Sequence, residues 1–360
     1  MPDPTPAQAF ANRLFEAALG TFDLMSVYLG DKLGYYRALS LSKHGLTSPQ
    51  LAEKTNTDER YAREWLEQQA ATGILNVGDV QAAAQRRRYT LPAAHATVLL
   101  NETDLSYIGP VARQVMAAAR QLPAVADAYR SGGGVSWRAY GPDMREAQAA
   151  LNRPFFANQL AKECLPAIRD VHAALTKGRP ARVADIACGG GWSSIAIAKA
   201  YPKAHVDGFD LDEPSVRLAR KNAKAEGVAD RVTFYCQDAA GMEHTGAYDL
   251  VIICEALHDF SRPVEALTTM RKLASKTGTV IVVDERVGEE FSAPADAVER
   301  YFYGWSITTC LPDGMSHKPS AATGTVMRRP TLLKYAKAAG FKRAETLPIT
   351  NDFFRFYRLE

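Results

Sequence analysis

A histidine next to an aspartate follows an apolar run that has the character of a buried strand. The stretch CEALHDFS, residues 254–261, comes directly after DLVII. A neutral imidazole accepts protons near pH 7, so His258 at the mouth of a strand could act as a general base. The same side chain could instead bond a backbone carbonyl in an ordinary turn. The residues alone leave both roles open.

A glycine-rich turn lies upstream, in VADIACGGGWSS, residues 183–194. Gly189 and Gly191 allow a tight turn and let a ligand approach the backbone closely. Asp185 precedes the glycines by four residues, and Asp210 ends the next apolar run. An acid at that second position can bind ribose hydroxyls.

Two cofactor classes compete for this turn. A nicotinamide dinucleotide needs a third glycine or alanine so that its pyrophosphate meets a helix N-terminus, but Ser194 stands there. Asp185 would also lie near the phosphates, where a carboxylate is unfavourable. S-adenosylmethionine (SAM) carries a sulfonium and an ammonium instead of phosphate, so two acids suit it better. The residues favour SAM and leave an NAD(P)-dependent oxidoreductase as the alternative.

The elements that must position these residues alternate between strands and helices from about residue 181 onward. Strand-like runs occupy 182–188, 205–211, 231–238, 248–257, 279–285 and 353–359, and helical runs occupy 192–201, 213–227, 263–278 and 331–340. Such alternation predicts an α/β fold whose parallel sheet is covered on both faces and binds ligands at the carboxyl ends of its strands.

The first half of the chain is mainly helical. Two helices from Thr47 to Gly73, followed by two short strand-like pieces in 74–92, predict a winged helix, with Tyr61, Trp65 and Leu66 on one face of the second helix. That helix carries four acids against two arginines, which disfavours contact with phosphates. Arg86–Arg88 is expected on a solvated wing. We therefore expect dimerisation or packing on the second domain.

Between the domains, residues 106–122 and 158–175 are amphipathic and predict helices. The glycine-rich segment 131–144 separates them. It is either a connector or a lid near a ligand site.

The motifs VADIACGGG, GFDLD, FYCQDAA and YDLVIICEAL resemble the successive motifs of class I SAM-dependent methyltransferases. The resemblance implies a Rossmann-like domain with an antiparallel last strand. Its pattern D/E-x-G-x-G-x-G matches here, except that alanine replaces the first glycine. It assigns ribose binding to the acid after the second strand, and adenine binding to the residues after the third. The implied cofactor residues are Asp185, Ala187, Gly189, Gly191, Asp210, Leu211, Asp238 and Ala239, with Glu255 at the methionine end.

The stretch from Asp249 to Ser261 also resembles small-molecule O-methyltransferases, in which a winged-helix dimerisation domain precedes the catalytic domain. There His258 falls on the catalytic base, Phe260 replaces a tryptophan, and Asp284 falls on an acid that orients the histidine. The family's second orienting acid has no counterpart in residues 328–341. The whole chain is most similar to actinobacterial and fungal winged-helix methyltransferases.

The segment 288–328 interrupts the strand–helix alternation and is rich in aromatic side chains. Tyr301 and Trp305 lie four residues apart, so they either pack within a helix or wall a substrate pocket. Cys310, His317 and Thr325 are the polar candidates. An aromatic wall favours a flat or apolar acceptor. We predict that Tyr301, Trp305 and Cys310 line the acceptor site.

Composition sets the remaining expectations. Of 360 residues, 47% are hydrophobic and 23% charged, and the net charge of +3 gives no support for binding nucleic acid or a membrane surface. The five cysteines are scattered and form no metal-ligand spacing, which predicts reduced thiols, no metal and a cytoplasmic location. Neither a signal peptide nor a membrane-spanning run is evident in the sequence.

These observations predict a homodimeric SAM-dependent methyltransferase that modifies a small molecule by O-methylation, and they favour an aromatic acceptor. The expected domains are the N-terminal helices and winged helix in 1–100, a helical linker or lid in 101–180, and the SAM-binding domain in 181–360. A SAM-sensing winged-helix transcriptional regulator is the second alternative, beside the NAD(P)-dependent oxidoreductase.

Overall fold

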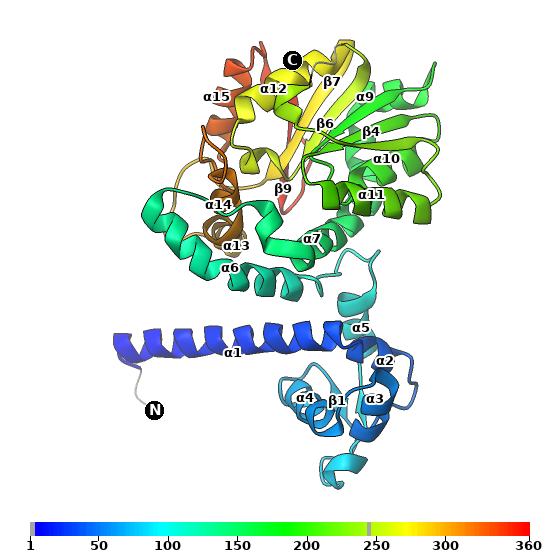
Figure 1. The fold of residues 1–360 in the computed structure, drawn as a ribbon, viewed down its shortest axis with the longest axis vertical. Coiled ribbons are helices and arrows are strands. Elements are labelled where there is room, and N and C mark those ends of the chain that lie inside the picture. The colour runs from blue at the N-terminus through cyan, green and yellow to red at the C-terminus, as the bar shows by residue number, and fades with distance from the viewer. Residues whose placement is uncertain (1–3, 243–245) are drawn as a thin grey trace. The chain divides into compact units, whose positions relative to one another are not determined.

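The computed structural model describes residues 4–242 and 246–360 of the chain. The chain forms two compact units, Met1–Met116 and Ala117–Glu360 (Figure 1). None of the helices within the described ranges is long and apolar enough to cross a membrane.

The first unit has the element order of a winged helix. A long helix begins it, and the two central helices precede a short antiparallel hairpin, as the sequence predicts. Its elements are α1 (Pro6–Lys32), α2 (Tyr35–Ser40), α3 (Ser48–Thr55), α4 (Glu59–Ala71), β1 (Asn76–Val77), η1 (Ala84–Arg86), β2 (Tyr89–Thr90) and α5 (Ala93–Leu100). Its core gathers around Trp65, whose ring packs edge-on against Tyr35 and Tyr36.

One residue of α4 differs from the prediction. Trp65 and Leu66 are buried, but the Tyr61 side chain is 79% exposed. The buried stripe of α4 consists of Ala62, Trp65, Leu66 and Gln69, at the spacing of a helix face. Tyr61 lies just outside this stripe, so it faces solvent.

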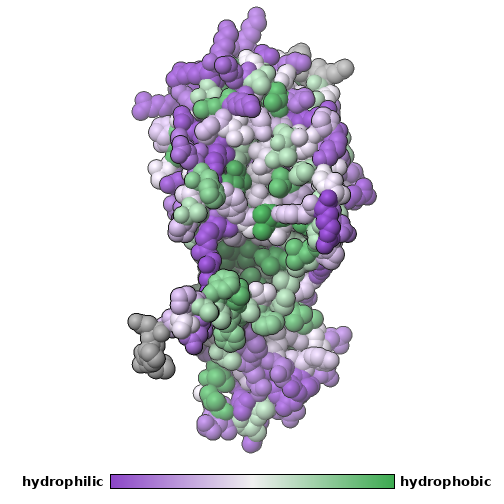
Figure 2. Space-filling view, turned by 90° about the vertical axis from the view of Figure 1, so that its left-hand side faces the viewer, coloured by the Kyte–Doolittle hydropathy of each residue, from purple (hydrophilic) through white to green (hydrophobic). Residues whose placement is uncertain are grey.

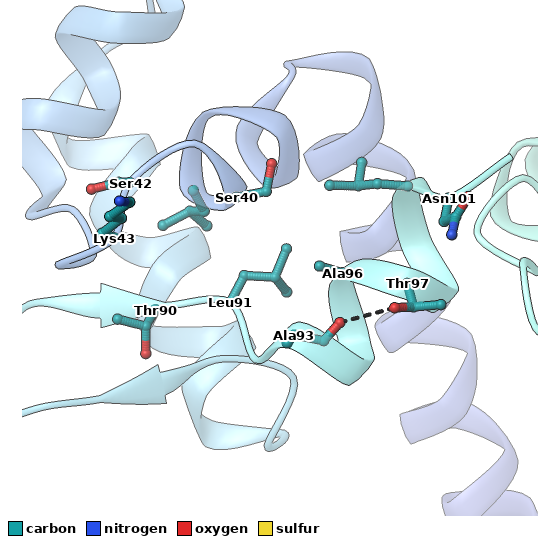
Figure 3. A pocket seen from close by; sticks show the side chains of 11 residues that line it. Ser40, Ser42, Lys43, Thr90, Leu91, Ala93, Ala96, Thr97 and Asn101 are labelled. Atoms are coloured by element: carbon teal, nitrogen blue, oxygen red, sulfur yellow. Dashed lines mark hydrogen bonds between the residues drawn. The ribbon is translucent and has the colours of Figure 1, made fainter. Parts of the chain in front are cut away.

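An open hollow of about 670 Å³ lies on the first unit (Figure 3). Leu39 and Ser40 of α2, Leu91, and Ala96 and Thr97 of α5 are among the residues that line it. It contains none of the predicted site residues, all of which belong to the second unit.

Helices precede the sheet of the second unit. They are α6 (Val111–Ser131), which contains the boundary between the units, η2 (Trp137–Tyr140), α7 (Gly141–Phe155), the π-helical η3 (Phe156–Cys164), α8 (Leu165–Ala167) and α9 (Arg169–Thr176). The glycine-rich segment is therefore shorter than predicted, because Pro142 in the first turn of α7 is compatible with a helix start.

The sheet has the strand order β5-β4-β3-β6-β7-β9-β8. The first five of these are parallel, and β9 runs antiparallel to β7, which confirms the predicted α/β class. The strands are β3 (Arg182–Ile186), β4 (His205–Asp210), β5 (Val232–Cys236), β6 (Tyr248–Cys254), β7 (Ala274–Glu285), β8 (Ala344–Thr346) and β9 (Phe354–Leu359).

Helices cover the two faces of this sheet, and a buried apolar cluster lies on each face (Figure 1). They include α10 (Trp192–Ala200), α11 (Glu213–Ala225), α12 (Pro263–Leu273) and α15 (Arg329–Ala338). The helix predicted to reach residue 278 ends at Leu273. Ala274 already pairs with Tyr248, so the residues before Gly278 join β7 instead of the helix.

The segment before α15 contains three further helical elements: α13 (Ala297–Trp305), the π-helical η6 (Ser306–Cys310) and α14 (Leu311–Gly314). They correspond to the insertion expected at 288–328.

Candidate active site

The carboxyl ends of β3 and β6 lie side by side in the middle of the sheet. From β3 the chain first extends the sheet through β4 and β5, and then through β6 and β7 on the other side. Parallel α/β sheets bind ligands at such a reversal of strand order. The predicted cofactor residues follow β3, β4 and β5, and His258 and Asp284 belong to the ends of β6 and β7.

Two acids, Asp185 of β3 and Asp210 of β4, hold the turn that follows β3. Asp185 is 1% exposed and accepts hydrogen bonds from the Ser193 and Ser194 hydroxyls at 2.6 and 2.5 Å. The Gly189 backbone N–H donates to Asp210 Oδ2 at 2.8 Å, which joins the ends of β3 and β4. Ser194 thus hydrogen-bonds the Asp185 carboxylate and does not stand in for the third glycine of a dinucleotide-binding turn.

The backbone conformation of Ala187 explains why glycine is usual at this position in the family that the sequence resembles. Its φ is +54°, in the left-handed region that disfavours a side chain. For a residue with a Cβ this conformation costs roughly 1–2 kcal/mol. The turn is therefore formed here despite the alanine, with the bonds of its neighbours holding it in place.

Both acids are suited to a cationic or hydroxyl-bearing ligand. Asp210 accepts from the backbone N–H groups of Gly189 and Asp212, and Asp185 accepts from the Ser193 and Ser194 hydroxyls and from the Ser194 backbone N–H. Burial raises the pKa of Asp185 and of Asp210 to about 6, and the hydrogen bonds oppose this shift. A nearby positive charge would stabilise their ionised forms.

The remaining predicted cofactor residues line the neighbouring strand ends. Leu211 is 62% exposed, whereas Ala239 is buried. Asp238 accepts from the Ala240 backbone N–H at 2.8 Å and pairs with Arg262 at 3.0 Å. The side chain of Asp238 thus caps a short 3-10 turn, η4 (Ala239–Gly241).

Helix α7 lies in the stretch 101–180, which the sequence analysis predicted to be helical without naming this helix, and it packs on the turn after β3. Arg145 forms a 2.6 Å ion pair with Asp212, and both side chains are 11% exposed. Ala149 lies against Gly190, where an added Cβ would come within 2.6 Å of the Ala149 Cβ. The side chain of Asn152 bonds the carboxyl of Glu255. Pro142 near the helix start is the sequence signal that could have revealed α7.

His258 lies in the short turn η5 (Leu257–Asp259) and is 2% exposed. Its Nδ1 atom is 2.8 Å from Asp284 Oδ1 and 2.9 Å from Glu285 Oε2. Nδ1 carries at most one hydrogen, so it donates to one of the two. Glu285 is thus a second acid within reach of the ring, and it comes from β7 and not from 328–341. The second acid of VVDE was its sequence signal.

The charges around His258 favour its protonated form. Burial alone would lower the pKa of His258, but Asp259, Glu285 and Asp284 outweigh it and raise this pKa well above its ordinary value. Asp259 Oδ1 lies 3.4 Å from Nε2. The imidazolium keeps the pKa of Asp284 low despite burial, whereas burial and the neighbouring Asp284 raise that of Glu285.

The predicted acceptor residues come from α13 and η6. Tyr301 and Trp305 pack edge to face, with ring centroids 5.9 Å apart, and Tyr301 is 41% exposed. Cys310 is close to His258, and burial beside Asp259 raises the pKa of its thiol to about 12. Thr325 is buried beside Cys310, whereas His317 is exposed.

The segment between α6 and α7 packs onto this insertion. The Trp137 backbone N–H donates to Asp313 Oδ1 at 2.6 Å, and the Tyr140 hydroxyl donates to the Thr308 carbonyl at 2.8 Å. The structure therefore ties 134–140 to the helices that carry the predicted acceptor residues.

Two sets of side chains have atoms close enough to share a cation, His258–Asp284–Glu285 and His258–Asp259–Cys310. We interpret them as a hydrogen-bonded network, because the histidine nitrogen in the first set is already paired with carboxylates. The absence of a metal stays a prediction from sequence.

Comparison with known proteins identifies the domains. A family model described as a methyltransferase domain matches residues 178–317, which include the glycine turn, His258, Asp284, α13 and η6. A second, described as an Rv2258c-like winged HTH domain, matches residues 22–101. The chain contains a SAM-dependent methyltransferase domain. The winged helix predicted from sequence is confirmed, and methyl transfer is favoured over the oxidoreductase alternative.

Individual relatives are distant. The chain is 29% identical over 181 residues to a ubiquinone biosynthesis O-methyltransferase of Aromatoleum aromaticum, covering 49% of this chain and 71% of that protein. Matches to two further curated methyltransferases cover 36% and 52% of those proteins.

Solved structures agree over nearly the whole length. A putative O-methyltransferase of Nostoc punctiforme has a TM-score of 0.68 at 22% identity, covering 99% of each chain. Human N-acetylserotonin methyltransferase in complex with SAM has a TM-score of 0.69 at 16% identity, covering 100% of this chain and 99% of that one. At such identities the likeness shows the fold.

Proposed function

We propose that this methyltransferase transfers the methyl group of SAM to a hydroxyl of a small-molecule acceptor. One observation carries the proposal: the acid-lined turn after β3 lies beside the β6 end, where His258 is held by Asp284 and Glu285. A methyl donor on the turn would present its sulfur toward that network. The O-methyltransferases among the similar proteins support oxygen as the acceptor atom.

The residues present fit SAM. The buried Glu255 Oε1 has no hydrogen-bond partner among the described residues, and the sulfonium of SAM is a cation. We assign the ribose hydroxyls to Asp210, with Leu211 beside them, and the adenine to Asp238 and Ala239. The turn around Asp185, Ala187, Gly189 and Gly191, together with Glu255, holds the methionine end. Bound SAM supplies an electrophilic methyl group, and the protein aligns the acceptor with it.

On the acceptor side we place Tyr301, Trp305 and Cys310 around a flat, aromatic molecule. The aromatic pair supplies apolar contact area. Asp284 fixes the His258 ring through Nδ1, which leaves Nε2 as the ring atom for the acceptor oxygen.

We also infer a homodimer formed through α1. Large apolar side chains of this helix are exposed: Phe10, Leu14, Phe15, Leu19, Phe22, Met25 and Leu29. Figure 2 shows exposed apolar side chains, in green, on the face that includes the N-terminal half of α1. A contiguous apolar stripe of this kind is typical of a protein interface.

Nucleic acid is not the partner we propose for the winged helix. Of the three wing arginines, Arg87 pairs with Glu67 at 2.8 Å, and Arg88 donates to the Gly45 carbonyl at 2.9 Å. Glu67 of α4 thus neutralises Arg87, and the Arg88 guanidinium is hydrogen-bonded within the domain. The five cysteines are unpaired, which supports the cytoplasm as the location.

Calorimetry with SAM and S-adenosylhomocysteine (SAH) tests the cofactor assignment. We expect micromolar binding in the wild type and its loss in Asp210→Ala, because the carboxylate that joins the turn to β4 is removed. Asp230→Ala is the matched control, since Asp230 is 73% exposed and lies before β5, at the opposite end of the strand. The absence of SAM and SAH binding in the wild type would refute the proposal.

A further inference from the structure

Glu255 is the first residue after β6 and is held in an unusual conformation. Its φ is +55°, which costs a residue with a side chain roughly 1–2 kcal/mol. Its backbone N–H donates to the Val283 carbonyl of β7 at 2.8 Å, so the position is fixed by the neighbouring strand. Such strain at a strand end is typical of a functional position. It places the carboxyl at the ends of β6 and β7, beside the end of β3.

Within the described residues the Glu255 carboxyl pairs with no lysine or arginine, and the His258 ring is the cation that acts on it. Its Oε1 is buried and unpartnered within the described residues, while Asn152 of α7 bonds the carboxyl. The charges of His258 of η5 and Asp284 of β7 influence the pKa of Glu255. The charge of Glu255 in turn raises the pKa values of Cys254 of β6 and Tyr301 of α13. None of these is a lysine or an arginine.

Burial raises the pKa of Glu255 to about 8, with a smaller contribution from Asp284, while His258 and Asn152 oppose the shift. Without a ligand, Glu255 is therefore mostly neutral at pH 7. A positive charge placed beside it would favour the carboxylate. The methyl-bearing sulfur of SAM is such a charge.

His258 is poorly suited to take up the acceptor's proton. The three surrounding carboxyl groups raise the pKa of His258 well above its ordinary value, which favours the imidazolium, and an imidazolium has no free lone pair. The ring can instead donate a hydrogen bond from Nε2 to the acceptor oxygen, which stabilises negative charge there. The buried, unpartnered Oε1 of Glu255 at the β6 end then offers another proton acceptor.

We propose that Glu255 receives the acceptor's proton, and that the positive charge of bound SAM holds Glu255 ionised until transfer. This inference rests on the proposed function. Glu255 takes the proton of the acceptor O–H as that oxygen forms its bond to the methyl carbon. The carbon–sulfur bond breaks, and its electron pair stays on sulfur. One positive and one negative charge disappear together, leaving a thioether, a methyl ether and a neutral Glu255.

A difference between SAM and SAH follows. SAM binding near pH 7 should release close to one proton from Glu255, and SAH, whose sulfur is neutral, should release much less. Between about pH 6 and 8 the affinity for SAM relative to SAH should rise by up to tenfold per pH unit. Asp185 and Asp210 meet parts that SAM and SAH share, so their protonation cancels in the comparison.

The test measures proton release by calorimetry at pH 7 in two buffers of different ionisation enthalpy. Wild-type protein, Glu255→Gln and Asp259→Asn are each titrated with SAM and with SAH. Asp259 is the rival base, because its Oδ1 lies 3.4 Å from His258 Nε2 and has no hydrogen-bond partner within the described chain. We expect the SAM–SAH difference to vanish in Glu255→Gln and to persist in Asp259→Asn.

The other outcomes overturn the inference in different ways. A difference that persists in Glu255→Gln and vanishes in Asp259→Asn would assign the proton to Asp259. Loss of SAH binding in Glu255→Gln would limit Glu255 to the role proposed above, holding the methionine end, and would overturn its role as the base. Equal proton release for both ligands in the wild type would overturn the inference while leaving the proposed function standing. Failure of both ligands to bind the wild type would overturn both.

Discussion

Replacing Gly190 with alanine should separate α7 from the cofactor turn. The φ of Gly190 is not in the left-handed region, so the backbone tolerates a side chain. The added Cβ would lie 2.6 Å from the Ala149 Cβ, whereas carbon atoms pack at about 3.5–4.0 Å. One of the two segments must therefore move by about 1 Å. The turn is anchored by Gly189 to Asp210 and by Asn222 to the Gly190 carbonyl, so α7 should move.

The expected loss follows from the cost of overpacking. Forcing an extra methyl group into a packed site costs roughly 1–3 kcal/mol. If intact α7 packing is needed for binding, the SAH Kd of Gly190→Ala should rise between about 5-fold and 150-fold. Calorimetry measures this Kd, and circular dichroism confirms that the variant is folded. Gly304→Ala is the control, because Gly304 has open space around its Cβ position and no left-handed φ.

Ala149→Gly tests whether the contact itself is responsible. It removes the methyl group that the new side chain meets, at a cost in helix stability of about 1 kcal/mol. We expect Gly190→Ala/Ala149→Gly to bind SAH within about threefold of Ala149→Gly alone. A double variant as weak as Gly190→Ala, or a single variant that binds SAH normally, would refute the assignment of α7 to the cofactor site.

Two further predictions concern pH and assembly. SAH affinity should fall below about pH 6, because Asp185 and Asp210 have pKa values of about 6 and become neutral there. The fall should be up to tenfold per pH unit for each acid. Calorimetry from pH 5 to 8 measures this affinity, and a flat profile would contradict the prediction. In the ligand-free protein the sign is opposite: the same raised pKa values favour folding most below about pH 4, and this contribution is lost as the pH rises through 6. Phe15→Asp/Phe22→Asp should convert the proposed dimer to a folded monomer, since these side chains are 63% and 60% exposed; light scattering should show no such change for Leu41→Asp, whose side chain is 82% exposed outside α1.

The strand ends of the catalytic domain were predictable because their signals are local. Apolar runs set β3, β4, β6 and β7, and an acid or glycine turn follows each of the first two. The ligand position then follows from the rule that parallel sheets bind at their carboxyl ends. Asp185, Asp210 and His258 could therefore be placed near one another without tertiary information.

The missed features depend on tertiary contacts. Helix α7 begins at Gly141 and Pro142 behind a run of glycines, so its local composition indicated a loop. Successive residues of a strand point to opposite faces, which made Asp284 and Glu285 unlikely partners of one ring. They reach it together because both stand at the very end of β7. Residues 274–278 had helical composition, but pairing with β6 outweighed that local preference.

The number of acids at this site bears directly on the order of charge changes. Glu255, Asp259, Asp284 and Glu285 surround a single imidazole, and burial raises the pKa values of Glu255, Asp259 and Glu285. Such a site is short of positive charge before SAM binds, and the proposed transfer removes the sulfonium together with the charge on Glu255. The same site then holds a neutral acid beside a neutral thioether. The attraction that favours SAM is therefore absent for SAH, which allows the product to leave more readily than the donor.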